Sequence, residues 1–219
     1  MKTLGSLMAM AVASSALASH GTTYTDATGD LFDNGFTNLD ISGVYLENDA
    51  TNLYISVTTV AFQNWTKYMM YFDTENTGGT STNAWNRPVD LSGASIEYYL
   101  GSWVDQPTDN SQFVSWTGSE WDWGNVMMST NVVNGNTVTW TISLASMGLA
   151  VGDTFYFDVA TSGGGNDPGV DHLSRFDPAT PGWSSPSVAG PFLAYTVVPA
   201  PGAVALLGLA GLAGRRRRA

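Results

Sequence analysis

The sequence of 219 residues contains no cysteine and has few basic residues. Without cysteine, disulfide bonds, thiol nucleophiles and thiolate metal sites are all excluded. Lys2 and the block 215–218 account for five of the eight basic residues, which leaves three for the middle of the chain: Lys67, Arg87 and Arg175. All nineteen acidic residues lie between Asp26 and Asp177, so this region has a formal charge of −16. Nucleic acids and anionic membrane surfaces attract basic proteins, so we expect neither as a partner.

Recognisable catalytic patterns are also absent from the sequence. The only two histidines are His20 and His172, and no G-x-S-x-G motif or closely spaced histidine pair occurs. Glu120 and Asp122 leave a glycoside hydrolase as the least favoured alternative, because that chemistry needs two carboxylates facing each other across a cleft. We therefore expect a protein that is not an enzyme.

The N-terminal segment has the order of features that is typical of a secretory signal peptide. Lys2 supplies a positive charge, and residues 4–16 form a short apolar run. Ala16 and Ala18 then give the small-x-small pattern that a signal peptidase cleaves. The run is too short for a comfortable membrane span, and an N-terminal core helix is the weaker alternative. We expect residues 1–18 to be a signal peptide and the rest of the chain to be exported.

The C-terminal segment combines a proline motif, an apolar stretch and a basic block. Val198, Pro199 and Pro201 precede an apolar run at 203–214, which is followed by four arginines, Arg215, Arg216, Arg217 and Arg218. The run is about half as long as a membrane-spanning helix, and the arginines favour a cytoplasmic end. This tail, residues 199–219, resembles the PEP-CTERM sorting signal, although Ala200 replaces the usual glutamate. The resemblance implies processing by an exosortase and attachment to the cell envelope; a simple membrane anchor, transient or permanent, is the alternative.

The region between these ends, residues 19–198, alternates apolar and polar residues with the period of a β-strand. Such alternation is clearest at 53–57, 94–101, 138–144 and 155–159, whereas 68–72 is apolar on both faces and is predicted to be a central, covered strand. Asn134-Gly135 predicts a hairpin turn, and the only helix-like piece is 144–149. We therefore predict one all-β domain, an antiparallel β-sandwich of the jelly-roll or DOMON-like kind, flanked by a signal helix and a short C-terminal apolar helix.

A second resemblance concerns this predicted sandwich. The stretches 52–57, 71–75 with the glycines at 78–79, and 141–157 are similar to DOMON-like domains and to family 9 carbohydrate-binding modules. The resemblance implies a secreted β-sandwich. It supports this fold better than it supports sugar binding. A surface protein of the envelope or of a biofilm matrix, with no small ligand, is the alternative function.

Two groups of residues are candidate sites. Sugars stack on flat aromatic faces, and strand parity predicts a ligand-binding platform at Tyr99, Trp103, Trp121 and Trp123. The competing interpretation is that these rings pack against one another. Acidic loops offer the oxygen ligands that calcium prefers, and the candidate metal ligands are Asp26, Asp30, Asp33, Asp73 and Glu75. Solvated acidic loops without a metal are the simpler alternative, since the loop at Asp73 does not fit the EF-hand pattern.

Overall fold

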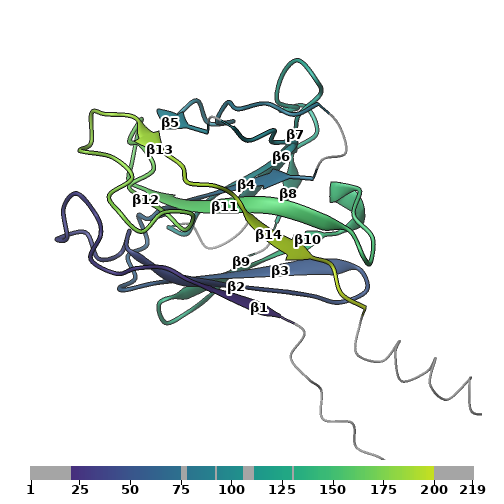
Figure 1. The fold of residues 1–219 in the computed structure, drawn as a ribbon, viewed down its shortest axis with the longest axis horizontal. Coiled ribbons are helices and arrows are strands. Elements are labelled where there is room, and N and C mark those ends of the chain that lie inside the picture. Colours follow the sequence, from purple (N-terminus) through teal and green to yellow (C-terminus); the bar gives the residue numbers. More distant parts are fainter. Residues whose placement is uncertain (1–20, 75–77, 92, 106–110, 130, 200–219) are drawn as a thin grey trace, which may run out of the picture.

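The computed structural model describes residues 21–199, except 75–77, 92, 106–110 and 130. In these residues the chain forms two antiparallel β-sheets that pack face to face (Figure 1). The predicted signal peptide and nearly all of the predicted sorting tail lie outside the described residues, as does Glu75. Within the described residues, no helix combines the length and apolar character needed to cross a bilayer.

The first sheet has five strands in the order β1-β2-β3-β10-β9. Their bounds are Thr22–Thr25, Ile41–Asn48, Asn52–Thr59, Thr137–Ser143 and Asn131–Asn134. Alternate residues of β3 and β10 are buried, which confirms the predicted alternation at 53–57 and 138–144. Trp140 of β10 is completely buried, and its indole N–H donates to the hydroxyls of Ser102 (2.9 Å) and Ser111 (3.1 Å). The polar atom of the largest core side chain is therefore satisfied.

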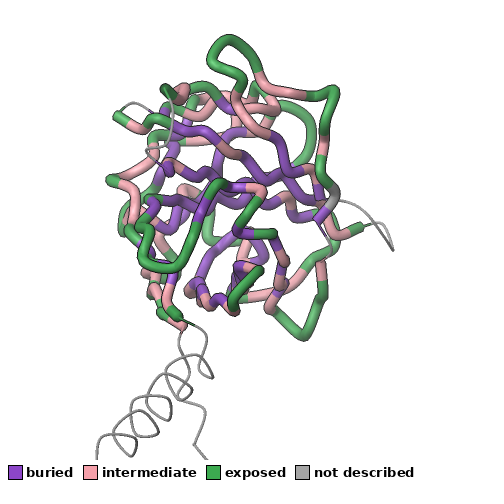
Figure 2. The backbone as a smooth tube through the Cα atoms, turned by 90° about the vertical axis from the view of Figure 1, so that its right-hand side faces the viewer, coloured by how far each residue is buried: buried purple, intermediate pink, exposed green. Residues whose placement is uncertain are grey.

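The second sheet follows the order β12-β11-β4-β6-β7-β8, and β14 also pairs with β11. Its strands are β12 (Asp171–His172), β11 (Thr154–Ser162), β4 (Lys67–Asp73), β6 (Tyr98–Trp103), β7 (Ser111–Ser115), β8 (Met127–Met128) and β14 (Leu193–Thr196). One face of this sheet contributes Tyr68, Met70 and Phe72 to the core between the two sheets. Figure 2 shows this buried interior as a continuous band within an exposed surface of loops.

The outer face of the second sheet is covered as well. Leu91 and Ile96, from the segment between β4 and β6, pack with Met69, Tyr71 and Tyr99 in a second apolar cluster. The same segment carries β5 (Val89–Asp90), which pairs in parallel with β13 (Ser187–Val188). Five consecutive residues of β4 are consequently buried, as the apolar run at 68–72 predicts.

Two local predictions are confirmed, one of them with a shift of one residue. The hairpin joins β9 and β10, and Asn134 pairs with Thr137, so the turn residues are Gly135 and Asn136. Gly135 has φ +61° and Asn136 is not among the residues with positive φ, which matches a type II′ turn. The helix-like piece is one 3₁₀ turn, η1 (Ala145–Met147), which ends at Gly148 with φ +68°.

Candidate functional site

The predicted aromatic platform is mostly packed rather than exposed. Tyr99 points off the outer face of β6, as parity predicts, but the covering segment leaves it completely buried. Its ring contacts Trp85 (centroids 5.6 Å apart) and Trp121 (6.1 Å). Trp103 is half-buried against Trp85, at 5.8 Å. Tyr99 therefore offers no face to a ligand.

Trp121 and Trp123 do not share a strand, contrary to the parity argument. Trp121 forms a single bridge with Trp116 after the turn at Gly118, and a further turn follows it at once. The Trp121 ring packs on Trp116, with centroids 5.6 Å apart. Trp123 is 43% exposed, the most exposed of the four predicted platform residues. Tyr99, Trp103 and Trp121 thus lie in packed aromatic contacts, and the four predicted residues do not form a flat binding surface.

A groove of about 560 Å³ lies next to this covered region. The residues that line it come from β4, β11, the covering segment and the chain before β14: Asp73, Leu91, Gly93, Ala94, Tyr156, Ala189, Gly190, Pro191 and Phe192. The Tyr156 ring is 37% exposed, and Phe192 is partly buried beside it in the lining. Asp73 accepts a hydrogen bond from the Ser95 N–H (3.1 Å). Aromatic rings and one carboxylate therefore converge on an open concave surface.

A second constellation consists of three carboxylates from two segments of the chain, the loop between β1 and β2 and strand β12. Asp30 lies in the loop between β1 and β2, Asp40 immediately precedes β2, and Asp171 begins β12. One carboxylate oxygen from each lies within 4.8 Å of those of the other two. Asp40 and Asp171 are each only 3% exposed. The Ile41 N–H donates to Asp171 Oδ2 (2.6 Å), so this carboxylate also joins β2 of the first sheet to the edge strand β12 of the second.

The surroundings of these carboxylates make their charged forms costly. Burial, together with the neighbouring charges of Asp30 and other acids, raises the pKa of Asp26 to about 8. Burial also raises the pKa values of Asp30, Asp40 and Asp171, the last well above its usual range. Both oxygens of Asp30, Oδ2 of Asp26 and Oδ1 of Asp40 are buried and have no hydrogen-bond partner among the described residues. The group can therefore take up protons or a cation.

Of the five predicted metal ligands, the structure places Asp30 in this group and Asp26 close beside it. The charge of Asp26 raises the pKa of Asp171, which indicates this proximity. Asp33 is exposed, and its Oδ1 accepts a hydrogen bond from the Gly35 N–H (2.9 Å). Asp73 belongs to the groove instead. The loop that contains Asp26 and Asp30 was thus predicted from the sequence, whereas Asp40 was not among the predicted ligands.

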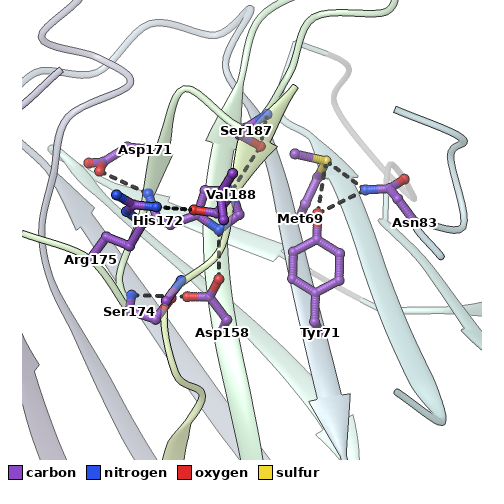
Figure 3. Close-up of polar contacts among 12 residues, drawn as sticks. Met69, Tyr71, Asn83, Asp158, Asp171, His172, Ser174, Arg175, Ser187 and Val188 are labelled. Atoms are coloured by element: carbon purple, nitrogen blue, oxygen red, sulfur yellow. Dashed lines mark hydrogen bonds and ion pairs between the residues drawn. The ribbon is translucent and has the colours of Figure 1, made fainter. Parts of the chain in front are cut away.

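A buried Ser-His-Asp arrangement was also not expected from the sequence (Figure 3). His172 Nδ1 lies 2.6 Å from Asp158 Oδ2, and His172 Nε2 lies 3.2 Å from Ser187 Oγ. This is the contact order of a serine-hydrolase triad. All three residues are completely buried, however, and none of them lines the groove. Ser187 Oγ also accepts a hydrogen bond from the Gly169 N–H (3.1 Å), so the arrangement functions as an internal polar support in this conformation.

The predicted processing sites are described only at the start of the tail. Asn48 holds the backbone of Val198 through two hydrogen bonds, of 2.8 and 3.0 Å, and Pro199 is exposed. Ala16, Ala18, Pro201 and Arg215–Arg218 lie outside the described residues. No protein-family model matches the chain, and no curated protein matches its sequence significantly.

Proposed function

We propose that the chain is an exported protein that is not an enzyme, is displayed at the cell envelope and binds carbohydrate in the groove beside Tyr156. The single observation that supports carbohydrate binding is the groove itself, whose lining includes the partly exposed Tyr156, Phe192 and Asp73. Stacking on rings and hydrogen bonding to a few fixed polar groups is how proteins hold neutral sugars. A high negative charge is compatible with such ligands.

Export and display are supported by the two end segments and by the place where the described fold begins and ends. The positive residue, apolar run and small-residue site at the N-terminus favour cleavage by a signal peptidase. The proline motif, apolar run and arginine block resemble a substrate of an exosortase. The start of β1 and the end of β14 lie at the same end of the sandwich (Figure 1), where the Tyr24 hydroxyl donates to the Ala194 carbonyl (2.6 Å). A tether at this end would leave the opposite loops free.

A non-enzymatic role is supported by the burial of the one triad-like arrangement. A nucleophile must reach its substrate, and Ser187 has no exposed surface. A structural protein of the envelope or matrix, without a small ligand, is the second candidate. The packing of Trp85 on Trp103 and of Trp121 on Trp116 favours it, because rings that cover one another are not available for stacking.

Affinity electrophoresis of the full-length chain against a panel of immobilised polysaccharides separates the two candidates. We expect retention by at least one polysaccharide, and we expect Tyr156→Ala to weaken it at least about fivefold through loss of ring stacking. Trp65→Ala is the matched control, because Trp65 is 36% exposed, like Tyr156, but does not line the groove. Retention that Tyr156→Ala leaves unchanged, or no retention by any polysaccharide, would favour the structural role.

A further inference from the structure

Within residues 21–199, as far as the structure describes them, no positively charged side chain balances the carboxylate group of Asp30, Asp40 and Asp171. The basic residues of the described part of the chain are all engaged elsewhere. Lys67 pairs with Asp105 (3.3 Å), and Arg175 pairs with Asp177 (2.7 Å). Arg87 donates to Ser162, Gly163 and Asp167. Buried carboxylates are normally paired or bound to a metal, since an isolated buried charge is strongly unfavourable.

An independent observation concerns Asp40, which has an oxygen with no bonding partner in the described structure. The residue is 97% buried, and its Oδ2 accepts a hydrogen bond from the Gly29 N–H (2.9 Å). Its Oδ1 is buried and accepts none. Both carboxylate oxygens of Asp30 are also buried and accept no hydrogen bond from the described residues. Unsatisfied acceptors of two residues that meet at one point suggest that a bound ligand completes their bonding.

We propose that Asp30, Asp40 and Asp171, with Asp26 beside them, bind one calcium ion. The ligands on offer are carboxylate oxygens, which suit hard cations, and the 26–30 loop can add backbone carbonyls. Both ring nitrogens of His172, which follows Asp171 in the sequence, are engaged with Asp158 and Ser187, which disfavours metals that prefer imidazole. Magnesium demands near-ideal octahedral geometry and retains several waters. Calcium is larger and accepts more varied geometries, so it fits a buried group of carboxylates better.

The proposed ion would have a structural role because its ligands come from both sheets. Asp30 and Asp40 belong to the loop that leads into β2 of the first sheet, whereas Asp171 belongs to the edge strand β12 of the second. This loop and β12 lie at the end of the sandwich away from the start of β1 and the end of β14 (Figure 1). Calcium would therefore join the two sheets at that end. Extracellular calcium modules have dissociation constants of about 10⁻⁴–10⁻³ M, and we expect this range.

Calorimetric titration of the full-length chain with CaCl₂, and its melting temperature in EDTA or in excess CaCl₂, test the proposal. We expect one bound ion per chain and a melting temperature several degrees higher when free calcium exceeds the dissociation constant about 100-fold. MgCl₂ at the same concentration should give a clearly smaller shift. No heat of binding together with equal melting temperatures in EDTA and CaCl₂ would overturn the proposal, and would mean that the carboxylates are protonated instead.

Substitutions separate a metal site from a merely acidic cluster. Asp40→Asn removes one charge without changing shape, so we expect calcium affinity to fall at least about tenfold. In EDTA the same variant should melt at or above the wild-type temperature, since repulsion is relieved. Asp33→Asn is the matched control, because Asp33 is an exposed aspartate of the same loop outside the group. Unchanged affinity in Asp40→Asn, or an equal loss in Asp33→Asn, would contradict the assignment.

A spectroscopic measurement on the wild type does not depend on the folding of any variant. Terbium occupies calcium sites and emits when a nearby tryptophan is excited. Trp183 packs in a cluster with Leu31 and Val170, the chain neighbours of Asp30 and Asp171. We expect tryptophan-sensitised terbium emission that CaCl₂ displaces at the calorimetric dissociation constant. Emission that calcium does not displace, or no emission, would count against the site.

Discussion

At the scale of single residues, the distinctive feature of the described structure is a set of buried carboxylate oxygens that have no hydrogen-bond partner within it. Alternation along a strand predicts which way a side chain points, and Tyr99 and Trp103 do leave the outer face of β6. It does not predict whether another part of the chain covers that face. For this reason the sequence indicated the direction of Tyr99 but not its complete burial.

Glu97 provides a residue-scale prediction of pH dependence. It is 2% exposed, and its Oε2 accepts a hydrogen bond from the Thr74 N–H (2.7 Å), while Oε1 has no partner in the described structure. Burial, opposed by this hydrogen bond, raises its pKa. A raised carboxyl pKa means that the folded state holds the proton more tightly, so stability is greatest below the ordinary pKa and falls as the pH rises through the raised value.

Glu97→Gln removes this titration. Relative to the wild type, we expect the variant to gain on the order of 1 kcal/mol of unfolding free energy between about pH 4 and about pH 8. Urea unfolding at both pH values, in EDTA throughout, measures the difference, and the other buried carboxylates cancel because both proteins contain them. A stability difference that is the same at both pH values would show that Glu97 does not titrate in this range.

At the scale of elements, local patterns predicted the strands and turns, and long-range pairing decided the sites. The alternation at 138–144, the covered run at 68–72 and the hairpin at Gly135 follow from residues that are neighbours in sequence. The carboxylate group needs β12 to lie beside the start of β2, some 130 residues away along the chain. No local signal specifies that contact, which is why Asp40 was not predicted as a ligand.

The β9–β10 turn allows a prediction at this scale. Gly135 has φ +61°, a backbone conformation that an alanine adopts only with strain, although a Cβ there would contact nothing. We expect Gly135→Ala to lower the free energy of unfolding by about 1 kcal/mol. Gly164→Ala is the control, because Gly164 is equally open but lacks a positive φ, so its substitution should be neutral or slightly stabilising. Equal effects of the two substitutions in urea unfolding would contradict the assigned turn.

At the scale of the whole molecule, the sandwich carries the proposed binding sites, and the two end segments carry the proposed signals for export and envelope display. The strongly negative charge of the sandwich disfavours nucleic acid as a partner, which stays a prediction, and the architecture agrees with the predicted all-β class. The proposed groove and the proposed calcium site both depend on side chains brought together by the two sheets. The proposed export and envelope display depend only on the order of short segments at the two ends of the chain. For this reason the sequence alone was sufficient to suggest them.

Intact-mass and terminal-peptide mass spectrometry of the chain recovered from cell-surface and cytosolic fractions tests this account most directly. We predict a surface-associated species that begins at Ser19, after signal-peptide cleavage behind Ala18. We also predict that most of this species lacks the arginine block 215–218, because an exosortase has processed the tail. Recovery of the chain only from the cytosol, with Met1 and Arg218 both present, would contradict the proposed export and envelope display.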